Sequence, residues 1–331
     1  MVATGGFPDG IPDRCPVCRR HIAVEPSPST GDALCPFCGT LVWPPPGELP
    51  QSRRTSVLHG FELLKKIGQN SQGPLYEARR IADNKPATIW TLSLQLALDE
   101  AIVRRFLQEA ATLAQLKHPN LLDVWGTHSF GSVHFFATEL FEGRSMQEVL
   151  QTANRLSLGD ALHIALRCAE ALEHAHRANI VHRHVEPRHI LVSRSGTVKL
   201  AGFGFCMSES GMMTTSTLDG EYIAPETARN AKHVDRRTDV YGLGGTLFRF
   251  VTGRIPFSGE NLIELIMAEE SGCYTPARSI NGDVPQRLDE ILERTLASDP
   301  ADRYPDCAEL IAELRSLGLE NRRLSFAQRG G

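Results

Sequence analysis

The stretch HRHVEPRHILV at residues 182–192, followed by VKLAGFG at 198–204, decides how this chain of 331 residues is interpreted. Each short motif is weak evidence alone, and the order in which this stretch and its companions occur carries the information. The companions are GQNSQG at 68–73, an amphipathic helical pattern at 99–117 that carries Glu109, HPN at 118–120, APE at 224–226, DVYGLG at 239–244 and DPADR at 299–303.

The hydrophobic pattern changes from strands to helices along the chain. Apolar spacing predicts strands at 61–67, 75–80, 87–94 and 133–140, with one helix at 99–117. After Gly143 it predicts helices at 157–177, 239–252, 261–270, 285–297 and 305–316. A strand-rich part followed by a helix-rich part predicts an α+β fold of two lobes with a cleft between them.

Together the motifs resemble a protein kinase domain of the serine/threonine type. The resemblance extends over residues 58–318 and implies a bilobal fold with a β-rich N-lobe at 58–140 and a helical C-lobe at 143–318. Kinases transfer a phosphoryl group by positioning ATP and Mg²⁺ and by orienting the hydroxyl group that attacks.

The resemblance shows two altered motifs in the N-lobe. The Gly-rich loop keeps Gly68 and Gly73, but its middle glycine is Asn70, whose side chain crowds the approach of a phosphate. Trp90 stands on the third strand where the family has the lysine that holds the phosphates. Glu109, which the family pairs with that lysine, is retained.

The polar groups of the C-lobe motifs are replaced as well. His184 stands for the family's proton-accepting aspartate, His189 for its metal-binding asparagine and Glu186 for a phosphate-contacting lysine. Gly202 stands for the aspartate that bridges the metal ions, and it offers no ligand. A positioned general base alone contributes roughly 10²–10⁴-fold to rate. Ordinary phosphoryl transfer is therefore not expected.

The residues that build the kinase frame are present. By resemblance, a column that joins the lobes consists of Leu113, Val124, His182 and Phe203, with Asp239 at its base. Glu226 is expected to form a buried ion pair with Arg303, and the loss of one partner of such a pair typically costs ~3–5 kcal/mol. The remnant of an adenine pocket comprises Gly68, Gly73, Leu75, Thr138, Glu139, Phe141 and Leu191.

Four of the eight cysteines form two C-x2-C pairs, Cys15 with Cys18 and Cys35 with Cys38. This spacing is typical of four thiolates around one tetrahedral Zn²⁺. Disulfides or free thiols are the alternatives, but disulfides are rare in the cytosol. We therefore predict a zinc ribbon at 15–43 after a disordered start at 1–14, followed by a proline-rich linker at 44–57 and, after the kinase-like domain, a flexible tail at 319–331. Structural Zn²⁺ is the expected cofactor, whereas ATP with Mg²⁺ is not expected.

Composition excludes several classes of function. A net charge of −4 argues against a strongly basic nucleic-acid binder. There is no run of 18 apolar residues that would span a membrane and no signal peptide, so a cytoplasmic location is expected. Lysine is scarce, with six among 35 basic residues, and the two catalytic-site positions that call for lysine hold Trp90 and Glu186.

Two further patterns have competing interpretations. His182, His184 and His189 share one loop and could bind a transition metal, although no regular ligand spacing supports that; otherwise they are core or hydrogen-bonded histidines. The run Thr214, Thr215, Ser216 and Thr217 is either a phosphorylation site or a polar loop.

The sequence thus predicts a catalytically inactive, pseudokinase-type regulatory or scaffold protein. It would act by binding a protein partner, for example an active kinase or another signalling protein. Two alternatives stay open. The first is a divergent serine/threonine protein kinase with residual ATP-dependent phosphotransfer, which needs a displaced lysine and an unusual metal site. The second is a switch that binds a nucleotide without catalysis.

Overall fold

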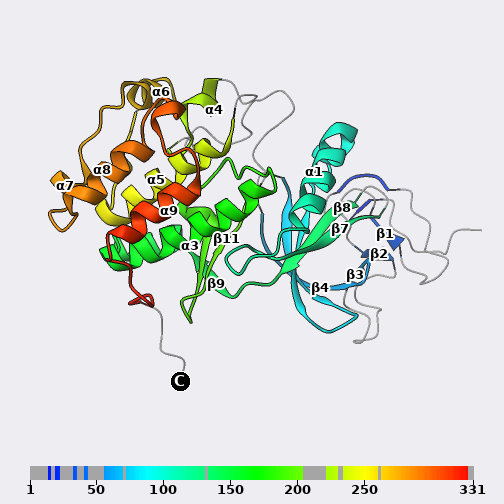
Figure 1. The fold of residues 1–331 in the computed structure, drawn as a ribbon. Helices are drawn as coiled ribbons and strands as arrows, with labels where there is room; N and C mark the ends of the chain where they lie inside the picture. The colour runs from blue at the N-terminus through cyan, green and yellow to red at the C-terminus, as the bar shows by residue number, and fades with distance from the viewer. Residues whose placement is uncertain are drawn as a thin grey trace, which may run out of the picture. The chain divides into compact units, whose positions relative to one another are not determined.

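The chain forms two units in the computed structural model (Figure 1). We call them the sheet unit, which comprises Met1–Ala114 and Val124–Leu140, and the helical unit, which comprises Gln115–Asp123 and Phe141–Gly331. The structure describes residues 14–15, 19–22, 33–35, 41–43, 56–69, 72–130, 133–203, 221–229, 234–259 and 262–326. The predicted change from a strand-rich to a helix-rich part is confirmed.

The sheet unit contains one antiparallel sheet of six strands in the order β3-β4-β5-β6-β8-β7. The strands are β3 (Ser56–Leu58), β4 (Phe61–Gln69), β5 (Pro74–Arg80), β6 (Pro86–Thr91), β7 (Val124–Phe130) and β8 (Val133–Glu139). Four of them match the predicted strands, whereas β3 and β7 lie in segments for which no strand was predicted. Both unpredicted strands lie at the edges of the sheet.

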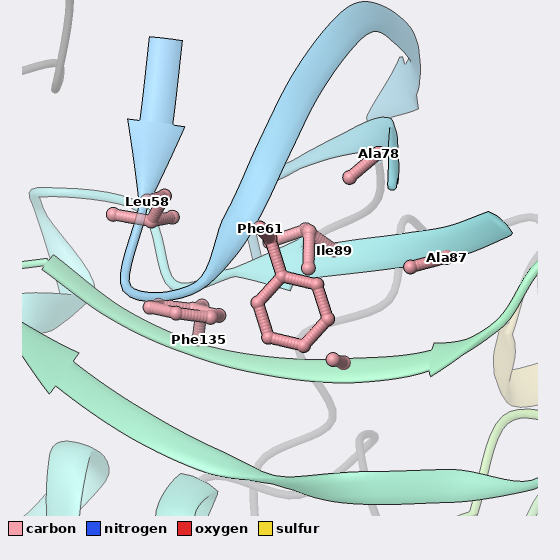
Figure 2. Close-up of a cluster of buried hydrophobic side chains, with 7 residues drawn as sticks. Leu58, Phe61, Ala78, Ala87, Ile89 and Phe135 are labelled. Atoms are coloured by element: carbon pink, nitrogen blue, oxygen red, sulfur yellow. The ribbon is translucent and has the colours of Figure 1, made fainter. Parts of the chain in front are cut away.

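Alternation along the strands gives the sheet two different faces. One face carries a buried apolar cluster to which β6 contributes Ala87 and Ile89 and β8 contributes Phe135 and Ala137. Figure 2 shows these side chains grouped with those of Leu58, Phe61 and Ala78. The residues that alternate with them along the strands, Trp90 on β6 and Phe136 and Thr138 on β8, therefore belong to the opposite face.

Helix α1 (Glu100–Leu113) packs against β7 and β8, beside which it lies in Figure 1. It begins where the Asp99 side chain accepts a hydrogen bond from the Ala101 N–H at 2.8 Å, an N-cap that satisfies one of the helix's free donors. The helix ends four residues before the predicted end at 117. The segment from Gln115 to Asp123 belongs to the helical unit, where the Leu122 N–H donates to the Leu200 carbonyl oxygen at 3.1 Å.

The helical unit is built around α3 (Leu158–Arg177) and α5 (Arg236–Thr252), which pack against each other. Helix α5 is buried on nearly all sides, as expected for a central helix. The predicted helices match α3, α5, α6 (Leu262–Ser271), α8 (Gln286–Thr295) and α9 (Cys307–Ser316). The shorter helices α2 (Met146–Ala153), α4 (Pro225–Arg229) and α7 (Ala277–Ile280) were not predicted.

A three-stranded sheet in the order β11-β10-β9 lies in the same unit. Its strands are β9 (Gly143–Ser145), β10 (Ile190–Ser193) and β11 (Val198–Leu200). The loop at 182–189 leads directly into β10, and the segment at 201–203 directly follows β11. Because β10 and β11 are paired, the two segments that hold the motif residues start from neighbouring strands.

The residues after α9 differ from the prediction of a flexible tail, because residues 319–326 are packed against α3. The Asp160 carboxylate accepts hydrogen bonds from the Asn321 amide and the Ser325 N–H, both at 2.9 Å. Leu324 is buried. Asp160 lies in the first turn of α3. Residues 319–326 therefore supply hydrogen-bond donors to a carboxylate at the start of this helix.

The N-terminal region is described only in short pieces. Arg14 and His21 form an antiparallel bridge, and β1 (Ala33–Leu34) pairs with β2 (Leu41–Trp43). Cys15 and Cys35 are both buried. Within the described part of the chain, none of the helices combines the length and the apolar character needed to cross a bilayer.

Candidate active site

Asp239, near the start of α5, fixes the beginning of the loop at 182–189. Its side chain is fully buried and accepts hydrogen bonds from the backbone N–H groups of His182 at 2.8 Å and Arg183 at 2.6 Å. The His176 Nε2 on α3 lies 2.7 Å from the same carboxylate. Arg183 has a φ of 70°, a left-handed conformation that these two bonds hold in place.

His182 is a structural residue, with both ring nitrogens engaged. Its Nε2 donates to the Ala201 carbonyl oxygen at 2.8 Å, and its Nδ1 accepts from the His184 N–H at 3.2 Å. The centroid of its ring lies 4.3 Å from that of the Phe203 ring. Burial lowers the pKa of His182, so the ring stays neutral near pH 7.

Three polar side chains converge in the loop after His182. Glu186 Oε1 lies 3.6 Å from His184 Nε2 and 3.7 Å from His189 Nδ1. The side chains of His184 and Glu186 are buried, while that of His189 is 24% exposed. Arg188 lies over the same carboxylate, with its Nε 3.0 Å from Glu186 Oε1. Burial, reinforced by the neighbouring histidines, lowers the pKa of His189 well below its ordinary value of 6.5.

Gly202 and His189 fit together. Gly202 has a φ of 87°, and a Cβ built on it would lie 2.7 Å from two ring carbons of His189. The imidazole thus occupies the space that any larger residue at position 202 would need. The His189 Nδ1 also lies 2.9 Å from the His184 carbonyl oxygen, which holds the ring against Gly202.

These contacts decide whether Mg²⁺ fits the site in the family's manner. Mg²⁺ requires oxygen ligands in near-octahedral geometry, and imidazole suits softer metals. Position 202 offers no side chain, and the ring of His189 fills the space beside it. The residues present do not fit the family's Mg²⁺ site.

On the sheet unit, Trp90 is held by neighbours on β8. Its indole ring stacks on Phe136 with the centroids 5.6 Å apart and the planes 10° apart. The indole N–H donates to Thr138 Oγ1 at 3.1 Å, and that hydroxyl donates to the Glu139 carbonyl oxygen. The ring of Phe136 in turn packs on the ring of Phe106 of α1, with the centroids 5.4 Å apart. Aromatic packing therefore connects α1 to the strand on which the family has its lysine.

Neither Glu109 nor the lysines of the sheet unit restore the family's ion pair there. Glu109 pairs with Arg105, one turn earlier on α1, at 2.8 Å. Lys65 pairs with Glu77, and its side chain is 68% exposed. Lys85 lies 3.5 Å from Asp83 and is similarly exposed, and Lys66 donates to Gln69. The displaced lysine required by the kinase alternative is not found among these three residues.

The remaining predicted pocket residues lie in both units. Gly73 is required by close packing, because a Cβ there would lie 2.1 Å from the Thr91 carbonyl oxygen. Gly68 on β4 is exposed, and Thr138 is buried. Leu75, Glu139, Phe141 and Leu191 are half-buried. Of the predicted column, Leu113 and Val124 are buried in the sheet unit, and His182 and Phe203 are buried in the helical unit.

Glu226 and Arg303 form a bidentate ion pair in the helical unit. The two Arg303 Nη atoms each lie 2.8 Å from a Glu226 carboxylate oxygen. Arg303 also donates to the carbonyl oxygens of Ala297 and Ser298. Burial acts to raise the pKa of Glu226, but the hydrogen bonds from Arg303 and Thr238 outweigh it and lower the pKa. The guanidinium is thus fully enclosed by acceptors.

Several predicted residues lie outside the described part of the chain, namely Cys18, Cys38, Asn70, Thr214, Thr215, Ser216 and Thr217. The Arg19 N–H donates to the Cys15 carbonyl oxygen at 2.9 Å, and Arg19 has a φ of 60°.

Sequence reasoning missed four residues that shape the site: Arg105, Phe106, Phe136 and Arg188. Of these, only Arg105 showed a sign of an ion pair in the sequence, because Arg105 and Glu109 are four residues apart on a predicted helix. Phe136 and Phe106 meet Trp90 through strand pairing and helix packing, which the sequence does not specify. Of the three loop histidines, His182 fits the alternative interpretation as a core residue, because both its nitrogens are engaged, and Glu186 lies beside His184 and His189 instead.

Comparison with known proteins identifies the family. Residues 61–313 match the model of the protein kinase domain. A probable serine/threonine-protein kinase of Clostridium perfringens is 31% identical over 261 residues, which are 78% of this chain and 38% of that protein. Serine/threonine-protein kinase PrkC of Bacillus subtilis is 29% identical over 77% of this chain and 40% of its own length. The chain thus spans about two-fifths of the length of these relatives.

Solved structures agree with this family assignment. The crystal structure of the PknI kinase domain of Mycobacterium tuberculosis superposes with a TM-score of 0.65 at 26% identity, over 78% of this chain and 96% of that one. The predicted bilobal kinase fold, with a β-rich N-lobe and a helical C-lobe, is confirmed.

These relatives correct the predicted function. The sequence predicted a catalytically inactive scaffold, but the relatives that match most of this chain are named serine/threonine-protein kinases. The comparisons favour the kinase alternative instead. The chain belongs to the protein kinase family.

Proposed function

We propose that this chain is a divergent serine/threonine protein kinase that transfers the γ-phosphoryl group of ATP to a protein hydroxyl group at a residual rate. The observation that carries the proposal is the kinship with serine/threonine-protein kinases over more than three-quarters of the chain. Buried Asp239 supports it, because its carboxylate holds the start of the loop that carries the motif residues.

In the proposed step, the hydroxyl oxygen forms a bond to the γ-phosphorus while the bond from that phosphorus to the bridging oxygen breaks. ADP leaves with the bridging oxygen. The hydroxyl proton passes to the imidazole of His184, which stands at the family's base position, and histidine is the commonest general base in enzymes. Glu186 is a positioning residue, because its carboxylate, 3.6 Å from His184 Nε2, stabilises the ring once it is protonated.

The rate should be low. Protein kinases typically turn over at about 1–100 s⁻¹. Trp90 supplies no cation for the phosphates, and Gly202 supplies no metal ligand. Electrostatic stabilisation of this kind is usually the largest contribution to such catalysis. We therefore expect a turnover below about 10⁻² s⁻¹, at least a hundredfold under the slower kinases.

Single-turnover and steady-state assays with γ-labelled ATP and a serine/threonine peptide mixture test the proposal. Phosphopeptides should be formed in proportion to the concentration of the chain, and His184→Ala should abolish them. The matched control is Arg177→Ala on the surface of α3, which should transfer at the parent rate. Transfer that survives in the His184→Ala chain, or none above the protein-free blank, would overturn the proposal.

We also propose that Cys15, Cys18, Cys35 and Cys38 hold one structural Zn²⁺. The spacing of the two pairs supports this, as does the burial of Cys15 and Cys35. Replacing all four cysteines with serine should remove one zinc ion per chain, measured by elemental analysis. An unchanged zinc content would contradict the assignment.

A further inference from the structure

The loop at 184–189 gathers three potential metal ligands. His184 Nε2, Glu186 Oε1 and His189 Nδ1 all lie within 4.8 Å of one another. The carboxylate oxygen is central to the group, at 3.6 Å and 3.7 Å from the two imidazole nitrogens. Ligand atoms bound to one tetrahedral zinc ion at about 2.0–2.1 Å are about 3.3 Å apart. The carboxylate oxygen therefore needs to approach each nitrogen by only a few tenths of an ångström, and the two nitrogens, within 4.8 Å of each other, need to approach by up to about 1.5 Å, to share an ion.

We propose that His184, Glu186 and His189 bind a divalent first-row transition metal, with Zn²⁺ as the fitting ion. Two imidazoles and one carboxylate form a ligand set that suits zinc and iron, whereas Mg²⁺ and Ca²⁺ prefer oxygen ligands alone. The site differs from the cysteine site at the N-terminus in both chemistry and position. The proposal goes beyond phosphotransfer, and an ion bound to His184 would occupy the imidazole that the proposed transfer step uses as its base.

The protein holds two of these ligands in place before any metal arrives. The side chains of His184 and Glu186 are only 5% and 3% exposed, so little water must be removed from them. The His184 N–H donates to His182 Nδ1, and the His189 N–H donates to the Glu186 carbonyl oxygen at 3.1 Å. His189 is the more exposed ligand, so an ion would enter from its side.

Two contacts compete with metal binding. The Arg188 Nε lies 3.0 Å from Glu186 Oε1 and supplies the positive charge that an ion would otherwise bring. The His189 Nδ1 lies 2.9 Å from the His184 carbonyl oxygen, so the ring must carry its proton on Nε2 before Nδ1 can bind a metal. Arg188 thus provides a variant whose effect on affinity is opposite to that of a lost ligand.

The test uses the full chain with all four N-terminal cysteines replaced by serine, so that the cysteine site cannot contribute. This chain should still bind one Zn²⁺ in a competition titration, and a large excess of Mg²⁺ should not displace it. Glu186→Gln, which keeps the side-chain shape, and His189→Ala should each weaken binding by at least about the 10–100-fold that outer-shell changes cause. Arg188→Gln should tighten binding several-fold, because it removes the competing cation.

The matched control is His174→Ala, which removes another histidine of the helical unit that stacks on His118 away from the cluster. Its affinity should equal that of the parent. Co²⁺ provides a second readout, because at this site it should show no thiolate charge-transfer absorption. Failure to bind Zn²⁺, or binding that Glu186→Gln and His189→Ala leave unchanged, would overturn the proposal. Circular dichroism of each variant shows that lost binding does not result from unfolding.

Discussion

Two regions of the helical unit have changed to very different degrees. The frame, which we define as Asp239, Glu226 and Arg303, keeps the charged residues of the kinase family in buried hydrogen bonds. The loop at 184–189 together with Gly202 holds other residues at the positions that the resemblance assigns to polar groups used on ATP and its metal ions. The difference shows which constraint acts on each region. Frame residues bond to other parts of the protein, whereas by resemblance the family's loop residues contact a ligand.

The side chains of the loop are nevertheless well packed. Its new residues contact one another, because His189 fills the space beside Gly202 and Glu186 lies between two histidines and Arg188. The two changes at 189 and 202 are linked, since the imidazole fits only beside a residue without a Cβ. The loop was thus repacked around a new set of contacts.

The strongest way to break this comparison is to remove a frame residue. Arg303→Ala leaves the Glu226 carboxylate without its main partner and should lower the free energy of unfolding by ~3–5 kcal/mol. Urea denaturation measures this. Arg177→Ala, which removes an exposed ion pair on α3, is the control and should cost less than ~1 kcal/mol. Equal losses of unfolding free energy for the two variants would show that the buried pair contributes no more to stability than an exposed one.

A buried carboxyl group near the frame, that of Glu269, should also give the protein a specific pH dependence. Burial, with a contribution from Glu226, raises the pKa of Glu269 on α6 from 4.5 to about 8. Between these values the folded state keeps a proton that the unfolded state has lost, so stability falls as pH rises and levels off above about 8. The slope from this group approaches about 1.4 kcal/mol per pH unit.

Glu269→Gln should remove that slope, because glutamine stays neutral at every pH. Thermal and urea unfolding of the parent and the variant at several values between pH 5 and pH 9 provide the measurement. The variant should gain stability over the parent as pH rises. Parallel curves for the two chains would contradict the assigned shift.

The repacked loop predicts a smaller effect at Gly202. Gly202→Ala should cost about 1–3 kcal/mol, because its φ is left-handed and its new Cβ would overlap His189. Gly60→Ala is matched in backbone geometry, with a φ of 88° and open space around it, and should cost less. In a His189→Ala background the extra cost of Gly202→Ala should disappear. Additive costs in that double-mutant cycle would mean that the two positions are independent.

The sheet unit predicts the smallest effect. Trp90→Phe keeps an aromatic ring on Phe136 but loses the hydrogen bond to Thr138, and should cost about 1 kcal/mol. Thr138→Val should cost a similar amount, and the double variant little more than either. Strict additivity in urea denaturation would show that the indole N–H and the hydroxyl do not form the bond.

The sequence predicted the frame better than the loop, for a physical reason. Asp239, Glu226 and Arg303 lie in motifs that occur in the family's order, so resemblance identified them. Helices with one apolar face were also predicted well, because periodicity reports burial directly. The edge strands β3 and β7 gave no comparable pattern.

The new contacts of the loop could not be predicted in this way. The overlap of His189 with Gly202 depends on the pairing of β10 with β11, and the contact of Trp90 with Phe136 depends on the register of β6 and β8. Neither is encoded in local spacing. Resemblance indicated which family residues have other residues in their place. The contacts of those other residues are visible only in the structure.

The stack of Trp90, Phe136 and Phe106 has a consequence for how α1 is held to the sheet. A lysine–glutamate pair at this place would weaken as ionic strength rises, because salt screens charges beyond about 8–10 Å and weakens exposed pairs. Three aromatic rings carry no net charge, so screening does not weaken their contacts. The attachment of α1 should therefore not weaken as ionic strength rises, and it should weaken when denaturant reduces the hydrophobic contribution.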